Sequence, residues 1–242
     1  MKNFLSAIQF ITILPVGQSD VFEPQRIIPY FPLVGMLLGL MLAVFDALAL
    51  MLWSRPVVAV LDVVFLAAAT GAFHIDGLGD TADGLFGQRP REKALAIMKD
   101  SRLGTMGLVA IAGGLAIKWG GIAALESHRF LFLVLVPAYA RCAMLFGMRF
   151  LDYGRPEGGT GSDFFKEKLN DADFWGLGIT VVISFFAGWK MILLNIGFVF
   201  LVAAIIFYYK KRMGGITGDM IGAMGEATES FLFLLVSIGG TV

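Results

Sequence analysis

Three kinds of residue are scarce in this 242-residue chain, and each scarcity excludes a class of protein. It has a single cysteine, Cys142, which excludes an internal disulfide framework and a multi-cysteine zinc site. Charged residues make up 16% of the chain, against about 25% in soluble domains. The net charge is zero, which gives no indication of nucleic-acid binding. Neither of the two histidines stands in a credible Ser-His-Asp or Cys-His arrangement. Because 57% of the residues are hydrophobic, we interpret the chain as an integral membrane protein.

Apolar residues fill seven segments that approach the length needed to cross a bilayer, around 20 residues each. The segments are Phe31–Trp53, Val57–Phe73, Thr105–Leu125, Phe130–Phe150, Phe174–Gly188, Met191–Tyr209 and Ile216–Ile238. The second and fifth are short, and six spans remain the alternative count. We therefore expect one all-α membrane domain over residues 1–242, a polytopic helix bundle. A short interfacial helix within Met1–Pro15, rather than a cleaved signal, should precede it.

Basic residues are distributed unevenly between the loops that join these segments. Fourteen of the nineteen Lys and Arg residues fall in alternate loops, among them 89–102, 149–168 and 210–212, whereas the opposite loops carry Arg55, Arg129 and Lys190. The positive-inside rule places the more basic side, with the N-terminus, in the cytoplasm. Every chemically rich stretch of the chain falls on that side, which predicts a site at the cytoplasmic membrane surface.

Three carboxylates arrive within eight residues directly after the second apolar segment, in His74–Gly87. If this stretch is helical, Asp76, Asp80 and Asp83 lie at i, i+4 and i+7, within roughly 60° of arc on one face. Like charges on one face repel each other unless a cation compensates them, and oxygen ligands suit Mg²⁺. We favour a Mg²⁺ site over the alternative, a solvated helix end.

A basic stretch, Met98–Gly107, follows the acidic one and precedes the next apolar segment. Lys99, Ser101, Arg102 and Thr105 are residue types that bind phosphate, and the N-terminal amides of a following helix favour anions. Asp100 is a candidate fourth carboxylate or general base. An ordinary basic loop is the alternative interpretation.

Two glycine-rich stretches lie on the same predicted side. Tyr153–Ser162, with Arg155 and Gly158 as candidate substrate contacts, resembles a loop that closes over a nucleotide, although a plain linker is equally compatible.

In the second stretch, Gly214–Glu229, Gly214, Gly218 and Gly222 are spaced for close helix packing. Asp219 and Glu226 share a face and are candidate metal ligands. A different interpretation is that Glu226 and Glu229 hydrogen-bond within the bundle. Arg141, inside the fourth apolar segment, could contact a phosphate or pair with an acid.

Four motifs resemble the cobalamin synthase family, also called adenosylcobinamide-GDP ribazoletransferase or cobalamin 5′-phosphate synthase. They are Tyr30–Gly35, His74–Gly84, Met98–Gly107 and Gly214–Asp219, and they occur in the family's order. The resemblance extends from about Phe4 to Glu229. The chain departs from the family at Gly79, where alanine is common, and its Pro156-Glu157-Gly158 stretch matches loosely.

The resemblance implies a Mg²⁺-dependent enzyme of the prokaryotic cytoplasmic membrane. It would join adenosylcobinamide-GDP to α-ribazole, or to its 5′-phosphate, and release GMP. On this hypothesis Asp76, Asp80, Asp83, Asp219 and Glu226 bind Mg²⁺; Lys99, Arg102 and Arg141 hold the diphosphate; and Asp83 or Asp100 accepts the hydroxyl proton. The competing hypotheses are a CDP-alcohol phosphotransferase of lipid synthesis and a cation-coupled transporter. The oligomeric state stays open, a homo-oligomer included.

Overall fold

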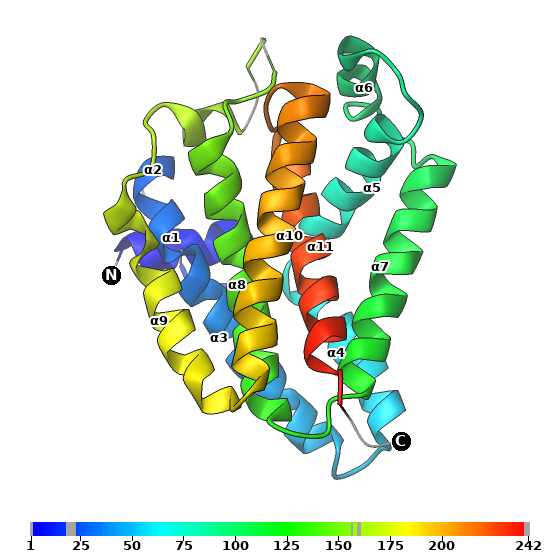
Figure 1. Ribbon diagram of the computed structural model, residues 1–242, viewed down its shortest axis with the longest axis vertical. Coiled ribbons are helices and arrows are strands. Elements are labelled where there is room, and N and C mark those ends of the chain that lie inside the picture. Colours follow the sequence, from blue (N-terminus) through cyan, green and yellow to red (C-terminus); the bar gives the residue numbers. More distant parts are fainter. Residues whose placement is uncertain (1, 18–22, 156, 159–160, 240–242) are drawn as a thin grey trace.

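The regular structure of the protein is helical throughout the part that the computed structural model describes, residues 2–17, 23–155, 157–158 and 161–239 (Figure 1). The α-helices are α1 Lys2–Ile11, α2 Pro24–Ile27, α3 Phe31–Ala49, α4 Arg55–Ala69, α5 Phe73–Leu85, α6 Arg91–Ile97, α7 Thr105–Ala123, α8 Arg129–Phe150, α9 Trp175–Ser184, α10 Lys190–Met213 and α11 Gly218–Val236. Short 3-10 helices are η1 Ile28–Tyr30, η2 Ser162–Phe165, η3 Asp171–Phe174 and η4 Phe185–Ala187. This confirms the predicted all-α class.

Four helical stretches are long and apolar enough to span a membrane: Pro24–Ala49, Thr105–Ala123, Arg129–Phe150 and Lys190–Met213. The bent pair α4 and α5 makes a fifth if it counts as one span. Two of the predicted spans are less regular, because α9 has only 10 residues and α11 carries three acids. The structure thus confirms a polytopic helix bundle, and the count of seven spans stays a prediction.

A sharp turn separates α4 from α5. Gly71 and Ala72 both adopt left-handed backbone conformations, with φ of +60° and +56°, and the two helices meet at 90°. Left-handed residues end a right-handed helix, so the apolar run of α4 does not continue into the acidic stretch. All three aspartates of that stretch therefore lie on one short helix, α5, with its own direction.

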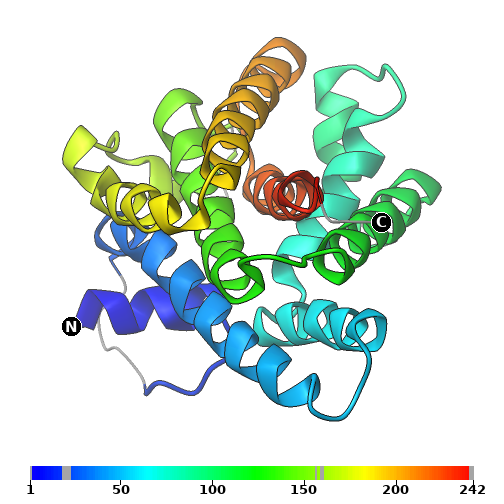
Figure 2. The same cartoon turned by 60° about the horizontal axis from the view of Figure 1, so that its bottom comes forward.

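Glycines let the helices approach closely at the core of the bundle. A Cβ atom on Gly35 or Gly39 of α3 would lie 2.5 Å from a carbonyl oxygen of α8, that of Pro137 or Leu133 respectively. Figure 2 shows α11 in the middle of the bundle, in contact with α5, α7, α8 and α10. Helix α8 is largely buried as well, whereas α7 and α10 are mostly exposed on the apolar flanks.

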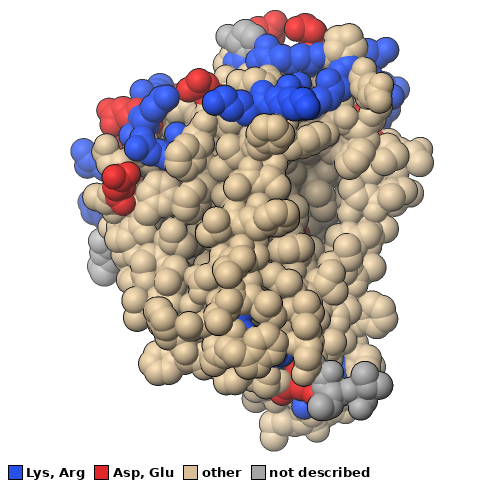
Figure 3. All heavy atoms as spheres, viewed as in Figure 1, with Lys and Arg blue, Asp and Glu red and all other residues tan. Residues whose placement is uncertain are grey.

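Lys and Arg residues gather at one end of the molecule, while the flanks seen in Figure 3 are almost free of charge. We call this end, formed by the loops 86–104, 151–174 and 210–217, the polar end. Helices α3, α7 and α11 run away from it, and α8 and α10 run back toward it (Figure 1). The loops that the sequence predicted to share one side therefore do so. Helix α1 lies crosswise against α3, as a short helix outside the spans would.

Candidate active site at the polar end

The two acidic helices, α5 and α11, touch through their backbones. A Cβ atom on Gly77 would lie 2.7 Å from the carbonyl oxygen of Asp219, and one on Gly222 would lie 3.2 Å from the Cα of His74. His74 is buried in this contact. The contact brings Asp219 of α11 beside the aspartates of α5, although 143 positions of sequence separate Asp76 from Asp219.

Asp76, Asp80 and Asp219 form what we call the acidic cluster. Asp80 lies within electrostatic range of Asp76, Asp83 and Asp219, and Asp219 within range of Asp76. Asp76 is exposed, and Asp80 is half-buried. Within the described residues, the carboxylates of Asp76 and Asp80 form no hydrogen bond or ion pair. Two carboxylates one helical turn apart are therefore open to a ligand.

Arg155 supplies a positive charge to this cluster. Its guanidinium donates a hydrogen bond to Asp219 at 2.5 Å, and the pair is partly buried. The Nε of Arg155 is buried and has no partner among the described residues. A charged group with an unused donor beside free carboxylates is suited to an anionic ligand that needs both a cation and hydrogen bonds.

Asp83 occupies a different position from the other acids of α5. Its carboxylate accepts hydrogen bonds from the backbone N–H of Gly104 at 2.6 Å and from that of Gly107 at 2.8 Å. It thus binds the N-terminus of α7, where unpaired amides and the helix dipole favour a negative charge. Both glycines are required sterically, since a Cβ atom on either would lie 2.4 Å from an Asp83 oxygen.

The clamp adds a structural role to the two that the sequence suggested for Asp83, metal ligand and proton acceptor. Each carboxylate oxygen accepts one amide hydrogen bond and keeps a further lone pair, so both roles stay predictions. Asp83 also holds the basic stretch 98–107 next to the acidic cluster. Gly104 and Gly107 of that stretch serve the clamp.

The Lys99 and Arg102 side chains of the basic stretch are exposed, whereas Met98 and Gly107 at its ends are buried. Arg102 donates three hydrogen bonds to Asp100, at 2.5 to 3.1 Å, and these bonds lower the pKa of Asp100 to about 2. A carboxyl with so low a pKa is a weak base, which argues against Asp100 as proton acceptor. Lys99 forms a long ion pair with Glu157 at 3.4 Å. Ser101 in the preceding loop and Thr105 at the start of α7 are exposed.

Two loops of the polar end are joined by backbone hydrogen bonds, and this contact places Arg155. The N–H of Ile216 donates to the carbonyl of Asp152 at 3.0 Å, and the N–H of Gly154 donates to the carbonyl of Ile216 at 2.8 Å. A side chain on Gly215 would collide with the Asp152 carbonyl, 2.6 Å away. Arg155 follows Gly154 in the chain, so these two backbone hydrogen bonds place it beside Asp219.

The predicted packing role of the three evenly spaced glycines is only partly right. Gly214 has a left-handed φ of +67° and ends α10, and the space around Gly218 at the start of α11 is open. Of these three glycines, only Gly222 lies in a close helix contact, that with α5.

Gly158 of the other glycine-rich loop turns the chain with φ of +77°, and its N–H donates to the Arg155 carbonyl at 3.2 Å. Its neighbours Pro156, Gly159 and Thr160 lie outside the described residues.

Arg91 is a residue of this region that the sequence analysis missed. Its guanidinium donates to the carbonyl of Met213 at 2.7 Å and to that of Gly154 at 2.6 Å. It thereby ties α6 to the end of α10 and to the loop that carries Arg155. An arginine in a basic loop has no sequence signal that distinguishes such a structural bridge from a solvated charge.

A buried ion network lies deeper in the bundle and accounts for two residues that the sequence assigned to the site. Lys118 of α7 pairs with Glu226 at 2.7 Å and with Glu229 at 2.8 Å, and Arg141 of α8 pairs with Glu229. All four side chains are at most 7% exposed. The predictions that Glu226 binds metal and that Arg141 binds phosphate are therefore not supported. Glu226 instead hydrogen-bonds within the bundle, and Arg141 pairs with an acid.

The fit of the acidic cluster to Mg²⁺ depends on its donor atoms. Among the described residues, no group of three or more His, Cys, Asp or Glu side chains is arranged to hold a metal ion by itself. Mg²⁺ in enzymes of phosphate chemistry is usually held by one or two carboxylates together with substrate phosphates and water. The free carboxylates of Asp76 and Asp80 meet that requirement, provided that the substrate supplies the remaining oxygens.

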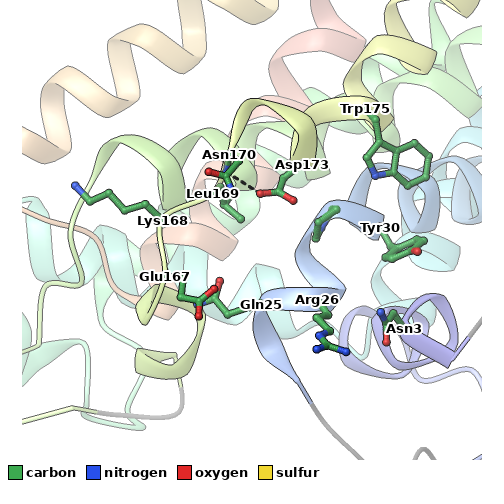
Figure 4. Close-up of a pocket in the computed structure, with 11 residues that line it drawn as sticks. Asn3, Gln25, Arg26, Tyr30, Glu167, Lys168, Leu169, Asn170, Asp173 and Trp175 are labelled. Atoms are coloured by element: carbon green, nitrogen blue, oxygen red, sulfur yellow. Dashed lines mark hydrogen bonds between the residues drawn. The ribbon is translucent and has the colours of Figure 1, made fainter.

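A polar pocket of about 340 Å³ lies at the same end but on another flank (Figure 4). Asn3, Gln25, Arg26 and Tyr30 line one side of it, and residues 167–170, Asp173 and Trp175 line the other. Two of its charged side chains have local partners: Arg26 pairs with Glu23 at 2.6 Å, and Asp173 accepts from the N–H of Asn170 at 2.7 Å. None of the predicted site residues lines it, so we do not count it as part of the site.

Comparisons with known proteins bear on the whole chain. A sequence model of the family described as cobalamin-5-phosphate synthase matches residues 3–237. A protein named adenosylcobinamide-GDP ribazoletransferase from Geotalea daltonii is 35% identical to this chain, over 99% of this chain and 99% of its own length. A protein of the same name from Alkaliphilus metalliredigens is also 35% identical, over 99% of this chain and 97% of its own length. The protein of that name from Clostridium novyi is 34% identical over 99% of this chain and 98% of its own. No solved structure matches the chain. Because the family model covers residues 3–237 and these relatives match over nearly their full lengths, the chain belongs to the cobalamin-5-phosphate synthase family.

Proposed function

We propose that this protein is an adenosylcobinamide-GDP ribazoletransferase, which joins adenosylcobinamide-GDP to α-ribazole or its 5′-phosphate and releases GMP. Family membership supports the reaction, and one structural observation supports the place where it occurs. That observation is the acidic cluster, in which two free carboxylates and an Arg155–Asp219 pair lie together at the polar end. Phosphoryl transfer needs positioning and neutralisation of charge more than covalent chemistry, and these groups supply both.

In the proposed reaction, a ribose hydroxyl oxygen attacks the phosphorus that is attached to cobinamide. The new P–O bond forms as the P–O bond to GMP breaks, and GMP leaves with the bonding electron pair. The hydroxyl proton passes to a carboxylate. Since Asp76 and Asp80 are assigned to Mg²⁺ and Arg102 holds Asp100 ionised, we assign this proton to Asp83, whose oxygens each keep a lone pair beyond the amide hydrogen bond.

Mg²⁺ would be held by Asp76 and Asp80, with Asp219 nearby, and would neutralise the charge of the diphosphate. Arg155 is already beside Asp219 and would bring its positive charge to a phosphate oxygen. Lys99 and Arg102, on the exposed basic stretch, would meet the diphosphate as it approaches. Gly79 and Gly107 keep α5 and α7 close to each other below that stretch.

We place the active site at the cytoplasmic face of a prokaryotic inner membrane, with the bilayer around the apolar flanks. The support for this orientation is the concentration of Lys and Arg at the polar end, which the positive-inside rule assigns to the cytoplasm. A cytoplasmic site also matches substrates that carry several phosphate charges and do not cross a bilayer unaided.

The first test is release of GMP by the purified protein in proteoliposomes. The protein receives adenosylcobinamide-GDP, α-ribazole and Mg²⁺ together, then each reagent is omitted in turn, and EDTA is added in a parallel sample. Release that requires both substrates and is abolished by EDTA is the expected result. Release of CMP from a CDP-alcohol instead of GMP would replace this function by phospholipid synthesis. Release of GMP that EDTA leaves unchanged would remove Mg²⁺ from the proposal and keep the transferase.

A further inference from the structure

Two apolar grooves run along one flank of the bundle, on either side of an aromatic ridge. Phe146 and Phe150 of α8 form the ridge, with their rings 6.1 Å apart and nearly parallel. The first groove, about 410 Å³, lies between α8 and α10 and is lined by Phe198, Val199, Val202, Ala203, Ile206 and Phe207 beside the ridge. The second, about 220 Å³, lies between α8 and α9, where Phe174 and Leu177 complete it.

A basic side chain lies at each groove. Lys210 lines the first groove, and Arg149 lines the second together with the acid Asp171. Lys210 is exposed and forms no side-chain ion pair within the described residues. Arg149 lies 3.6 Å from Asp171, but that carboxylate is fully exposed, so the pair is weak. Both cations lie near the helix ends that form the polar end, where a bilayer's headgroup layer would meet the protein.

We propose that these grooves bind one anionic phospholipid of the surrounding membrane. One acyl chain lies in each groove, astride the Phe146–Phe150 ridge, and the phosphate lies between Lys210 and Arg149. The apolar linings match hydrocarbon chains, and the flanking surface is apolar and exposed at Val199 and Phe207. Basic residues next to a membrane span attract anionic headgroups electrostatically.

Charge decides between this occupant and others. A zwitterionic phospholipid brings its own cation to the two basic side chains and gains less from them. A second copy of the chain, packed symmetrically on the same face, would bring its own Lys210 and Arg149 toward the first pair. Like charges placed opposite each other in an interface cost several kcal/mol. An anionic lipid is the occupant that satisfies both the apolar grooves and their basic ends.

The experiment is native mass spectrometry of the full-length protein in detergent, with phosphatidylglycerol or phosphatidylcholine of matched chain length added over a concentration series. Lipid retained per protein is measured for the wild type and three variants. Lys210→Gln/Arg149→Gln removes both cations. Ala203→Trp fills the first groove. Lys211→Gln is the matched control, since Lys211 is exposed on the same helix but lines neither groove.

The wild type should retain one phosphatidylglycerol at roughly tenfold lower lipid concentration than phosphatidylcholine. The double variant and Ala203→Trp should lose this preference, and Lys211→Gln should keep it. Equal retention of the two lipids by the wild type would overturn the proposal, as would an equal loss in Lys211→Gln. Dimers that phosphatidylglycerol does not dissociate and that Ala203→Trp abolishes would assign the grooves to a second copy of the chain.

Discussion

Replacing Gly107 by alanine should break the contact between α5 and the N-terminus of α7. The new Cβ atom would lie 2.4 Å from an oxygen of Asp83 and 2.9 Å from the carbonyl oxygen of Gly79. Real Cβ atoms do not approach oxygen so closely, so either the Asp83 side chain or α7 must move. Both movements lengthen the hydrogen bonds that Asp83 accepts from Gly104 and Gly107.

The size of the effect follows from those two bonds. A hydrogen bond to a charged group contributes about 1.5–3 kcal/mol, so losing both costs about 3–6 kcal/mol. Alanine has a higher helix propensity than glycine and returns about 1 kcal/mol. The expected decrease in the free energy of unfolding is therefore about 2–5 kcal/mol. Turnover should fall as well, because the clamp holds the basic stretch beside the acidic cluster.

Thermal unfolding of the detergent-solubilised protein measures this effect, with Gly113→Ala as the control. Gly113 lies on the same helix, and its Cβ atom would meet nothing within 4 Å, so that variant should be as stable as the wild type or slightly more stable. A second comparison, Gly107→Ala in an Asp83→Ala background, isolates the contact, since the substitution should cost less there. If Gly107→Ala and Gly113→Ala unfold alike, the clamp has no energetic importance and our reasoning is wrong.

Three further predictions concern the cluster, the buried network and the loop bridge. Asp80→Asn should leave the fold intact and reduce GMP release more than tenfold, because it removes a charge that the proposed metal needs. Glu229→Gln should destabilise the protein by about 3–5 kcal/mol in thermal unfolding, because it leaves two buried cations without their shared partner. Arg91→Lys should lower stability by about 1–3 kcal/mol, since an ammonium does not reproduce the guanidinium fork that donates to two carbonyls.

Each of these has an outcome that contradicts it. Asp80→Asn with more than about a tenth of wild-type turnover would remove Asp80 from the catalytic machinery. For Glu229→Gln the matched control is Glu92→Gln, an exposed acid at the start of α6 whose loss should be nearly neutral; equal effects would mean that the network does not stabilise the bundle. Arg91→Lys with unchanged unfolding would show that the loops hold together without the bridge.

Local spacing predicted the acidic face correctly. Asp76, Asp80 and Asp83 do lie on one helix, α5. Their separations of four and seven match the helical repeat, and this match can be recognised without knowing which residues contact them. The helical class and the common end of the basic loops were predictable for a similar reason. Hydropathy and charge asymmetry act along the whole chain and need no knowledge of contacts.

What spacing cannot predict is the partner of a side chain. Asp83 shares the face of Asp80, yet it accepts hydrogen bonds from two backbone amides at the N-terminus of α7. Whether these bonds form depends on how closely α5 and α7 pack. Arg141 pairs with an acid 88 positions away, so only the packed bundle decides between a phosphate contact and an ion pair. The turn at Gly71 and Ala72 was missed although Thr70-Gly71 interrupts the apolar run, and a glycine is the commonest residue at the end of a helix.

The buried ion network has a consequence for biogenesis. Membrane helices are inserted in the order of their synthesis, so Lys118 of α7 and Arg141 of α8 enter the bilayer before either glutamate has been made. A cation at the centre of an inserted helix costs about 2.5–3.5 kcal/mol, which applies to Arg141 in the middle of α8 and less to Lys118, five residues from the end of α7. Both glutamates arrive together on α11, the last helix, which pairs with each cation at once. Until then the nascent bundle carries two uncompensated charges, so arrival of α11 is the step that commits the chain to its final assembly.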